Sequence, residues 1–334
     1  IRLYSTRNIG VSKRGRSEAY LECQLSLISE ENLSLLWLIF SSEALIKNGT
    51  VNQLLENSKR FSGDLANKLR ERIYDSVVPE LANGITDARK LLNPTIDDIN
   101  LTYEMALTIL FRMLFIAYAE DRDLLPYKNN EIYRKRSLKQ KAQELSKKLD
   151  TDISQGSHHW NETLELFRAI YYGNKDWGVP EYAGTIFSNE KHISEAGFLI
   201  DNIRLDNQFF EKALKSLITI ESEDSQIGPV DFRSLSVREF GTIYEGLLES
   251  ELSLAEFDLT RDAKQNYIPA KDKNNIYVKK GEVYLHDKSG ARKSSGSFFT
   301  PDFAVEHLLD KSLEPALESH LKKLDGMDDL AAAD

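Results

Sequence analysis

The sequence contains a single cysteine, Cys23, among its 334 residues. No disulfide can form within the chain and no cysteine-rich zinc site can be built, which indicates a reducing compartment and predicts a cytoplasmic protein. Glycine-rich phosphate loops and the GxSxG and HExxH signatures of hydrolases and metalloproteases are also missing. The sequence therefore predicts neither a catalytic residue nor a metal ligand within this chain.

The sequence also has no surplus of positively charged residues and no apolar run long enough to span a membrane. The formal net charge is −10, from 43 Lys and Arg against 53 Asp and Glu. This excludes a uniformly basic nucleic-acid-binding protein, because such a protein needs surplus Lys and Arg to displace counterions from phosphate. The longest apolar run, Met105–Ala119, is too short for a membrane span and carries Arg112 at its centre, so no membrane partner is expected.

What the sequence does contain is a strong helical pattern. Hydrophobic residues make up 41% of the chain, which is enough for a packed core. Apolar residues recur at spacings of three and four as far as about Leu252, whereas alternation appears at the N-terminus and around a Lys-Gly turn near Ile276–Leu285. We expect a mainly α fold: a multi-helix bundle with a small β-hairpin near the C-terminal end and short strands at the N-terminus. In that hairpin, Ile276 and Val278 would pair with Val283 and Leu285.

Polar residues flank the most apolar of these predicted helices. Asp97 or Asp98 is expected to cap its start. Its end carries the stretch AEDRDLLP (Ala119–Pro126), which gathers three carboxylates and an arginine. We interpret this cluster as a buried ion-pair and capping network, because it offers no further ligand that would complete a metal site.

Three blocks of sequence are more specific than any single motif. FRMLFIAYAEDRDLLP (Phe111–Pro126), EFGTIYEGLLESEL (Glu239–Leu252) and SGSFFTPDFAVEHLL (Ser295–Leu309) occur in this order at wide spacing. Together they resemble the large adenine-specific DNA methyltransferases of the type IIG restriction–modification family and their relatives in phage-defence systems. The opening IRLY…YLECQL looks like the tail of that family's nuclease region. The third block is the most specific, because GSFFTP leads directly into an amphipathic helix.

The resemblance implies a division of the chain into four parts. These are the tail of a nuclease-like domain, a helical connector, a basic loop with the β-hairpin, and the start of a methyltransferase domain, at residues 1–30, 31–255, 256–295 and 296–334. The family's glycine-rich S-adenosylmethionine loop and its adenine-gripping NPPY/F segment lie further downstream, and neither is present in this sequence. We therefore expect an inactive internal fragment of a site-specific adenine-N6 DNA methyltransferase, one part of a combined restriction–modification enzyme. Mg²⁺ would serve only a nuclease domain outside this chain.

The third block resembles motif X of these enzymes, which helps to hold S-adenosylmethionine. Aromatic faces such as those of Phe298 and Phe299 favour a cationic sulfonium, and the free N–H groups of a helix start suit the methionyl carboxylate. The cofactor-binding candidates are Ser297, Phe298, Phe299, Thr300 and Pro301. Alternatively, the two rings anchor the hairpin to the helix and Thr300 caps that helix.

Two segments are basic within the acidic chain, Tyr133–Lys148 and Arg261–Lys293. A solvated face is the commoner explanation for such a run. Because the second segment adjoins motif X, we predict that it helps to position double-stranded DNA through Lys279, Lys280, Arg292 and Lys293. Other restriction or defence subunits are further expected partners. Two alternatives stay open: a non-catalytic helical scaffold of a phage-defence complex, and a helical DNA-binding subunit without methylation, which the net acidity disfavours.

Overall fold

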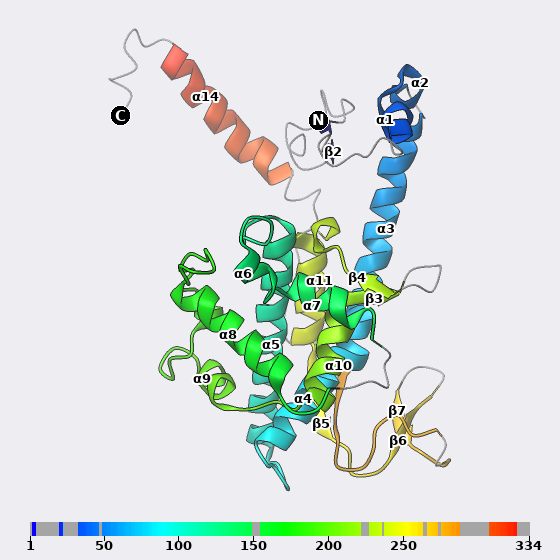
Figure 1. Ribbon diagram of the computed structural model, residues 1–334, viewed down its shortest axis with the longest axis vertical. Coiled ribbons are helices and arrows are strands. Elements are labelled where there is room, and N and C mark those ends of the chain that lie inside the picture. The colour runs from blue at the N-terminus through cyan, green and yellow to red at the C-terminus, as the bar shows by residue number, and fades with distance from the viewer. Residues whose placement is uncertain are drawn as a thin grey trace. The chain divides into compact units, whose positions relative to one another are not determined.

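The structure is a computed structural model that divides into two compact units, Ile1–Leu65 and Ala66–Asp334. It describes residues 2–4, 20–22, 33–46, 49–148, 154–221, 227–235, 237–262, 266–272, 275–287 and 307–325. Figure 1 shows the elements of both units along the chain. The sequence-based boundaries at residues 30, 255 and 295 stay predictions, because a division by compactness does not bear on the roles assigned to those parts.

The first unit begins with a short strand pair. Strand β1 (Arg2–Tyr4) runs antiparallel to β2 (Tyr20–Glu22), which confirms the N-terminal strands expected from the alternation. Helices α1 (Leu33–Phe40) and α2 (Ser42–Leu45) follow. Helix α3 (Thr50–Arg72) starts in this unit and ends in the second.

The second unit is mainly helical, as the apolar spacing predicted. Its helices are η4 (Ile73–Val77), α4 (Val78–Ala88), α5 (Ile96–Asp121), α6 (Glu131–Arg134), α7 (Leu138–Leu145), α8 (His158–Tyr172), η5 (Thr185–Phe187), α9 (Glu195–Asn202), α10 (Asn207–Ile218), η6 (Phe232–Ser234), α11 (Val237–Leu248), η7 (Leu309–Leu313) and α14 (Glu314–Asp325). The expected fold class, mainly α with small antiparallel strand pairs, is thus confirmed.

Helix α5 forms the centre of this unit, where it contacts α4, α7, α9 and strand β5 (Ser250–Leu254). Its start carries a capping box: Thr95 Oγ1 accepts a hydrogen bond from Asp98 N, and the Asp98 carboxylate accepts one from Thr95 N. The prediction that Asp97 or Asp98 is the N-cap is therefore wrong. Thr95 is the cap, and Asp98 completes the box from the third helical position.

Helix α5 is long and apolar enough to cross a membrane by length and composition alone. However, 56% of its most apolar window is buried inside the unit. Its side chains Met105, Ile109, Met113 and Ile116 are fully buried, and so is almost all of Arg112. Helix α5 is thus a buried core helix of this unit.

Three strand pairs complete the second unit. Strands β3 (Thr219–Glu221) and β4 (Ile227–Pro229) pair, as do β6 (Leu259–Arg261) and β7 (Tyr267–Pro269), and β5 pairs with β8 (Val283–Asp287). The turn before β8 is present, but the predicted partners are wrong. Strand β8 pairs with β5, and Val278 instead forms a bridge with Leu259.

Candidate functional site

The five cofactor-binding candidates, Ser297–Pro301, lie outside the described residues, and so do Arg292 and Lys293. The first two blocks of the resemblance are described, and so are Lys279, Lys280 and the helix in which the third block ends. The candidate site is therefore built from the surroundings of these blocks. It consists of the packing of α5 on α11, the strand pair β5–β8, and the turn that carries Lys279 and Lys280.

The first two blocks pack against each other. The rings of Tyr118 and Phe240 lie 5.4 Å apart, and those of Phe111 and Tyr244 also lie 5.4 Å apart. Residue numbers rise along α5 as they fall along α11, so the two helices run antiparallel. The aromatic residues that make this contact lie inside the quoted motifs. The order of the blocks along the chain, however, does not predict that they touch.

A glycine fixes how closely α11 approaches its neighbours. A Cβ added to Gly246 would overlap the hydroxyl oxygen of Tyr74, which extends from η4. Burial raises the pKa of Tyr74 to about 12, while its hydrogen bond to Ser250 opposes this shift. At the next residue of α11, Leu247, the backbone carbonyl accepts a 2.5 Å hydrogen bond from Tyr103 Oη. The small residue within YEGLLES is thus explained by helix packing.

Strand β5 begins directly after α11. Through its pairing with β8, it joins the end of the second block to the part of the chain that precedes the third block. In the β5–β8 pair, Ser250 lies opposite Asp287, the last residue of β8. Asn83 fixes the start of β8 from α4, because its side chain exchanges two hydrogen bonds with the backbone of Val283. The chain therefore leaves β8 beside the C-terminal end of α11. This non-local pairing was not visible in the alternation of either strand.

The carboxylate cluster of the first block is buried only in part: Glu120 and Asp121 form the predicted buried network, whereas Arg122 and Asp123 are exposed. The Glu120 carboxylate accepts hydrogen bonds from Tyr133 Oη at 2.8 Å, Leu138 N at 3.0 Å and Lys139 N at 2.8 Å. Desolvation by burial raises its pKa to about 7. Asp121 accepts hydrogen bonds from Lys139 Nζ at 2.5 Å and from the backbone of η6. Because Glu120 is only 1% exposed, this network joins helices and does not face a substrate.

The basic segment Tyr133–Lys148 is folded into the unit and does not form a free cationic surface. Four of its lysines form ion pairs: Lys135 with Glu131, Lys139 with Asp121, Lys141 with Glu162, and Lys148 with Glu211. Its arginines Arg134 and Arg136 lie over the rings of Tyr127 and Trp177. Most charged side chains of this segment contact other residues of the unit. The segment is therefore neither a solvated surface nor a phosphate-binding surface.

Lys279 and Lys280 are exposed on the turn that precedes β8. Two carboxylates fix the backbone of this turn. Glu282 accepts a hydrogen bond from Lys279 N, and Asp258 accepts one from Lys280 N, both at 2.9 Å. On the adjoining strand pair, the Arg261 guanidinium lies over the rings of Tyr267 and Tyr277 and pairs with Asp75 of η4. The turn is thus a fixed feature that presents two adjacent lysines.

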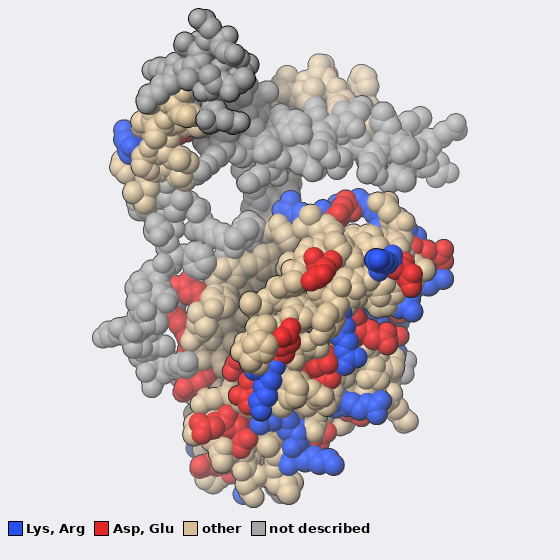
Figure 2. All heavy atoms as spheres, turned by 90° about the vertical axis from the view of Figure 1, so that its left-hand side faces the viewer, with Lys and Arg blue, Asp and Glu red and all other residues tan. Residues whose placement is uncertain are grey.

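Opposite charges are interspersed on the face of the molecule in Figure 2, where blue and red side chains alternate over the helices. This pattern agrees with the acidic composition and gives that face no extended basic patch.

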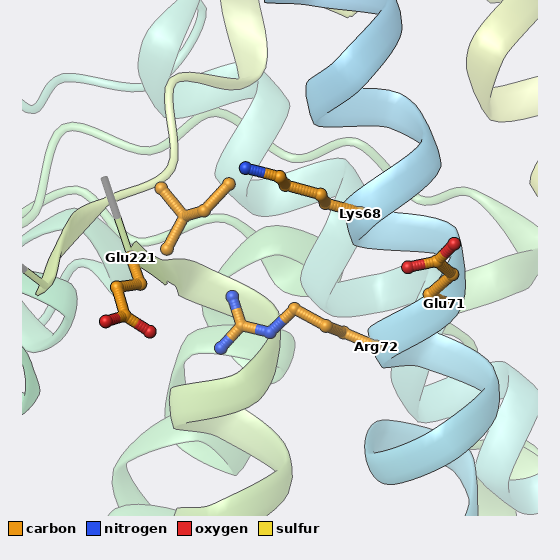
Figure 3. Close-up of a pocket in the computed structure, with 5 residues that line it drawn as sticks. Lys68, Glu71, Arg72 and Glu221 are labelled. Carbon is orange, nitrogen blue, oxygen red and sulfur yellow. The ribbon is translucent and has the colours of Figure 1, made fainter. Parts of the chain in front are cut away.

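A cavity of about 370 Å³ lies between α3 and β3. Its lining residues are Lys68, Glu71, Arg72, Ile220 and Glu221. Figure 3 shows Lys68 and Arg72 reaching from α3 toward the strand, and Arg72 donates a hydrogen bond to Thr219 O. Among the described residues, this lining contains no hydroxyl, thiol or imidazole side chain, so it offers no serine or cysteine nucleophile and no histidine base. No group of three metal-ligating side chains occurs among the described residues.

Comparisons with protein families, with curated proteins and with solved structures find no significant match to this chain.

Proposed function

We propose that this chain is the connector and the methyltransferase entrance of a site-specific adenine-N6 DNA methyltransferase, part of a combined restriction–modification enzyme of the cytoplasm. One observation supports this most directly: the first two blocks of the resemblance lie together. The first block packs on the second through Phe111 and Tyr244, and β8 ends opposite Ser250 of the second block before the chain continues toward the third. A helical unit that directs the chain toward motif X in this way fits the role of a connector.

In this proposal, Ser297–Pro301 contribute one side of the S-adenosylmethionine site, and later parts of the enzyme complete it. The sequence of this segment suits the cofactor, because the rings of Phe298 and Phe299 would attract a sulfonium and the helix start expected after Pro301 would attract a carboxylate. When bound, the cofactor supplies the methyl group for the exocyclic amine of a flipped adenine. The role of this chain is to hold that segment and to place Lys279 and Lys280 beside the DNA.

Calorimetric titration of the full-length protein with S-adenosylmethionine tests the proposal. Binding should weaken in Phe298→Ala/Phe299→Ala, by roughly fivefold to thirtyfold if each ring contributes about 0.5–1 kcal/mol of cation–π attraction. Phe257→Ala is the control, because Phe257 is an exposed phenylalanine of the same unit, 60% accessible. A full-length protein that binds no S-adenosylmethionine would exclude the methyltransferase assignment.

A non-catalytic scaffold of a phage-defence complex is the alternative function. Its main support is the arrangement itself, since the described residues form helices joined by buried polar networks and contain no group of three metal-ligating side chains. A scaffold would show no heat of binding with S-adenosylmethionine and would co-purify with other subunits. The same titration therefore separates the two functions.

A further inference from the structure

The antiparallel helices α5 and α11 share one aromatic face that other elements cover only in part, where the rings of Tyr182 and Phe187 meet that of Phe115. We name it the α5–α11 face and define it by Phe111, Phe115, Tyr244 and Leu248. Phe115 is 36% exposed, Tyr244 47% and Leu248 46%, and the Phe111 and Tyr244 rings are in contact. Phe111 and Phe115 are four residues apart on α5, as are Tyr244 and Leu248 on α11. The face therefore consists of two short apolar rows, one on each helix.

The helix formed by η7 and α14 has an uncovered apolar side of its own. Leu308, Leu313 and Leu317 are 54–61% exposed. From residue 307 to residue 320, every side chain is exposed except Leu309, which is half-buried. Leu309, Leu313 and Leu317 follow one another at a spacing of four, so they lie in one row along the helix. A helix of this length is marginal in water unless its apolar side packs against something.

Only a short segment of the chain separates the α5–α11 face from the helix formed by η7 and α14. Asp287 lies opposite Ser250, which follows Leu248 of the α5–α11 face by two residues. Residues 288–306 lead from there to the helix and, at no more than ~3.3–3.6 Å per residue, can span on the order of 60 Å. This exceeds the length of α5, about 40 Å for its 26 residues. The helix can therefore reach any part of the face without unfolding the strand pair.

We propose that η7–α14 docks on the α5–α11 face of the same chain, with its row of leucines between the Phe111–Phe115 row and the Tyr244–Leu248 row. Rows at a spacing of four are present on all three helices, and they favour the commonest class of ridge-into-groove packing between helices. In this arrangement, all three blocks of the resemblance form one interface, because the third block ends at Leu309. The inference goes beyond the proposed function and does not depend on S-adenosylmethionine binding.

Hydrogen–deuterium exchange of the full-length protein tests this docking through the backbone amides of residues 307–325. A docked helix exchanges slowly, whereas an uncovered one opens readily. In the variant Tyr244→Glu/Leu248→Glu, we expect these amides to exchange at least roughly tenfold faster, because two buried charges would oppose docking. Both side chains are nearly half exposed, so the variant should keep its fold, and unchanged protection of α10 amides verifies this. Leu92→Glu/Ile96→Glu, which changes one exposed residue just before α5 and one at its start, is the control.

Each outcome of this experiment decides the proposal. Slow exchange that is lost in the face variant and kept in the control supports docking within one chain. Fast exchange in the unmodified protein overturns it. Slow exchange that the face variant leaves unchanged shows that another surface covers the helix, and slow exchange that fades on dilution shows that a second copy covers it; both results also overturn the proposal. S-adenosylmethionine binding is measured separately, so failure here leaves the methyltransferase assignment intact.

Discussion

The hydroxyl of Tyr133 donates a 2.8 Å hydrogen bond to Oε1 of Glu120, and both side chains are buried. The same carboxylate accepts hydrogen bonds from the backbone of Leu138 and Lys139, so it holds α6 and α7 against the end of α5. Tyr133→Phe removes one donor from this buried carboxylate. We therefore expect the free energy of unfolding to fall by about 1–3 kcal/mol. Urea denaturation measures this decrease, and Tyr172→Phe, at an exposed hydroxyl, should cost much less.

A decrease no larger in Tyr133→Phe than in Tyr172→Phe would contradict the role of the buried network. The comparison is balanced, because the hydroxyl of Tyr172 also donates a hydrogen bond, at 2.7 Å to Asn189 Oδ1. The two variants therefore differ mainly in the burial of the bond that is removed, and burial is what makes an unsatisfied polar partner costly.

The same glutamate should make stability depend on pH. Burial raises the pKa of Glu120 to about 7 from its ordinary value of 4.5. Between these values the folded protein holds a proton that the unfolded chain releases. The stability linked to Glu120 is thus fully present below about pH 4.5 and is lost as pH rises through about 7. Over this range the free energy of unfolding should fall by roughly 3 kcal/mol on account of this group.

Glu120→Gln isolates this contribution, because glutamine does not titrate. The amide would place a donor near the Lys139 N–H group, so we expect the variant to be less stable at every pH. Its stability should nevertheless change less than that of the unmodified protein between about pH 5 and about pH 8. Urea denaturation at both pH values measures the difference, and an identical pH dependence in the two proteins would exclude Glu120 as its source.

The sequence predicted those parts of the fold that depend on local pattern. Apolar spacing predicted the helices, because a helix buries one side wherever it packs. The buried carboxylate network was also predictable, because AEDRDLLP places Glu120 and Asp121 at the end of the most apolar helix, where unpaired charges would be costly. The N-cap prediction was wrong because Thr95 and Asp98 share the capping box, and the sequence alone does not show which of them stands at the cap.

Features that depend on distant partners could not be predicted in this way. Alternation showed that Val283–Leu285 forms a strand, but the partner of that strand, β5, lies beyond an intervening strand pair. Likewise, the sequence shows Lys141 and Lys148 only as members of a basic run, because their partners, Glu162 and Glu211, come from other helices. The packing of Phe111 on Tyr244 belongs to the same class, since it joins residues far apart in the sequence.

A substitution at Gly246 tests how closely α11 packs against Tyr74 of η4. Gly246→Ala adds a Cβ that overlaps the Tyr74 hydroxyl, so we expect a decrease of about 1–3 kcal/mol in the free energy of unfolding. Tyr74→Phe removes the overlapping oxygen, and the double variant should therefore lose less stability than the sum of the two single variants. Gly228→Ala is the control, because nothing lies within 4 Å of its added Cβ. Strict additivity of the Gly246 and Tyr74 variants would argue against this contact.

The turn before β8 provides the DNA-binding test. If Lys279, Lys280, Arg292 and Lys293 contact phosphate, replacing all four with glutamine should weaken binding of the full-length protein to duplex DNA. The slope of log affinity against log salt concentration should also become shallower, by about 0.9 for each phosphate that the variant no longer neutralises. Fluorescence anisotropy at several salt concentrations measures both quantities.

The variant Lys279→Gln/Lys280→Gln tests the two of these four residues that the structure describes. Its matched control is Lys175→Gln/Lys191→Gln, which changes two exposed lysines elsewhere in the unit. Both double variants remove the same net charge, so a general electrostatic effect would change their salt slopes equally. A phosphate contact at the turn would change only the first. Glu282 and Asp258 hold the backbone of the turn in place, so removing the two side-chain charges should leave its conformation unchanged. Equal slopes in both variants and in the unmodified protein would remove the turn from the DNA interface.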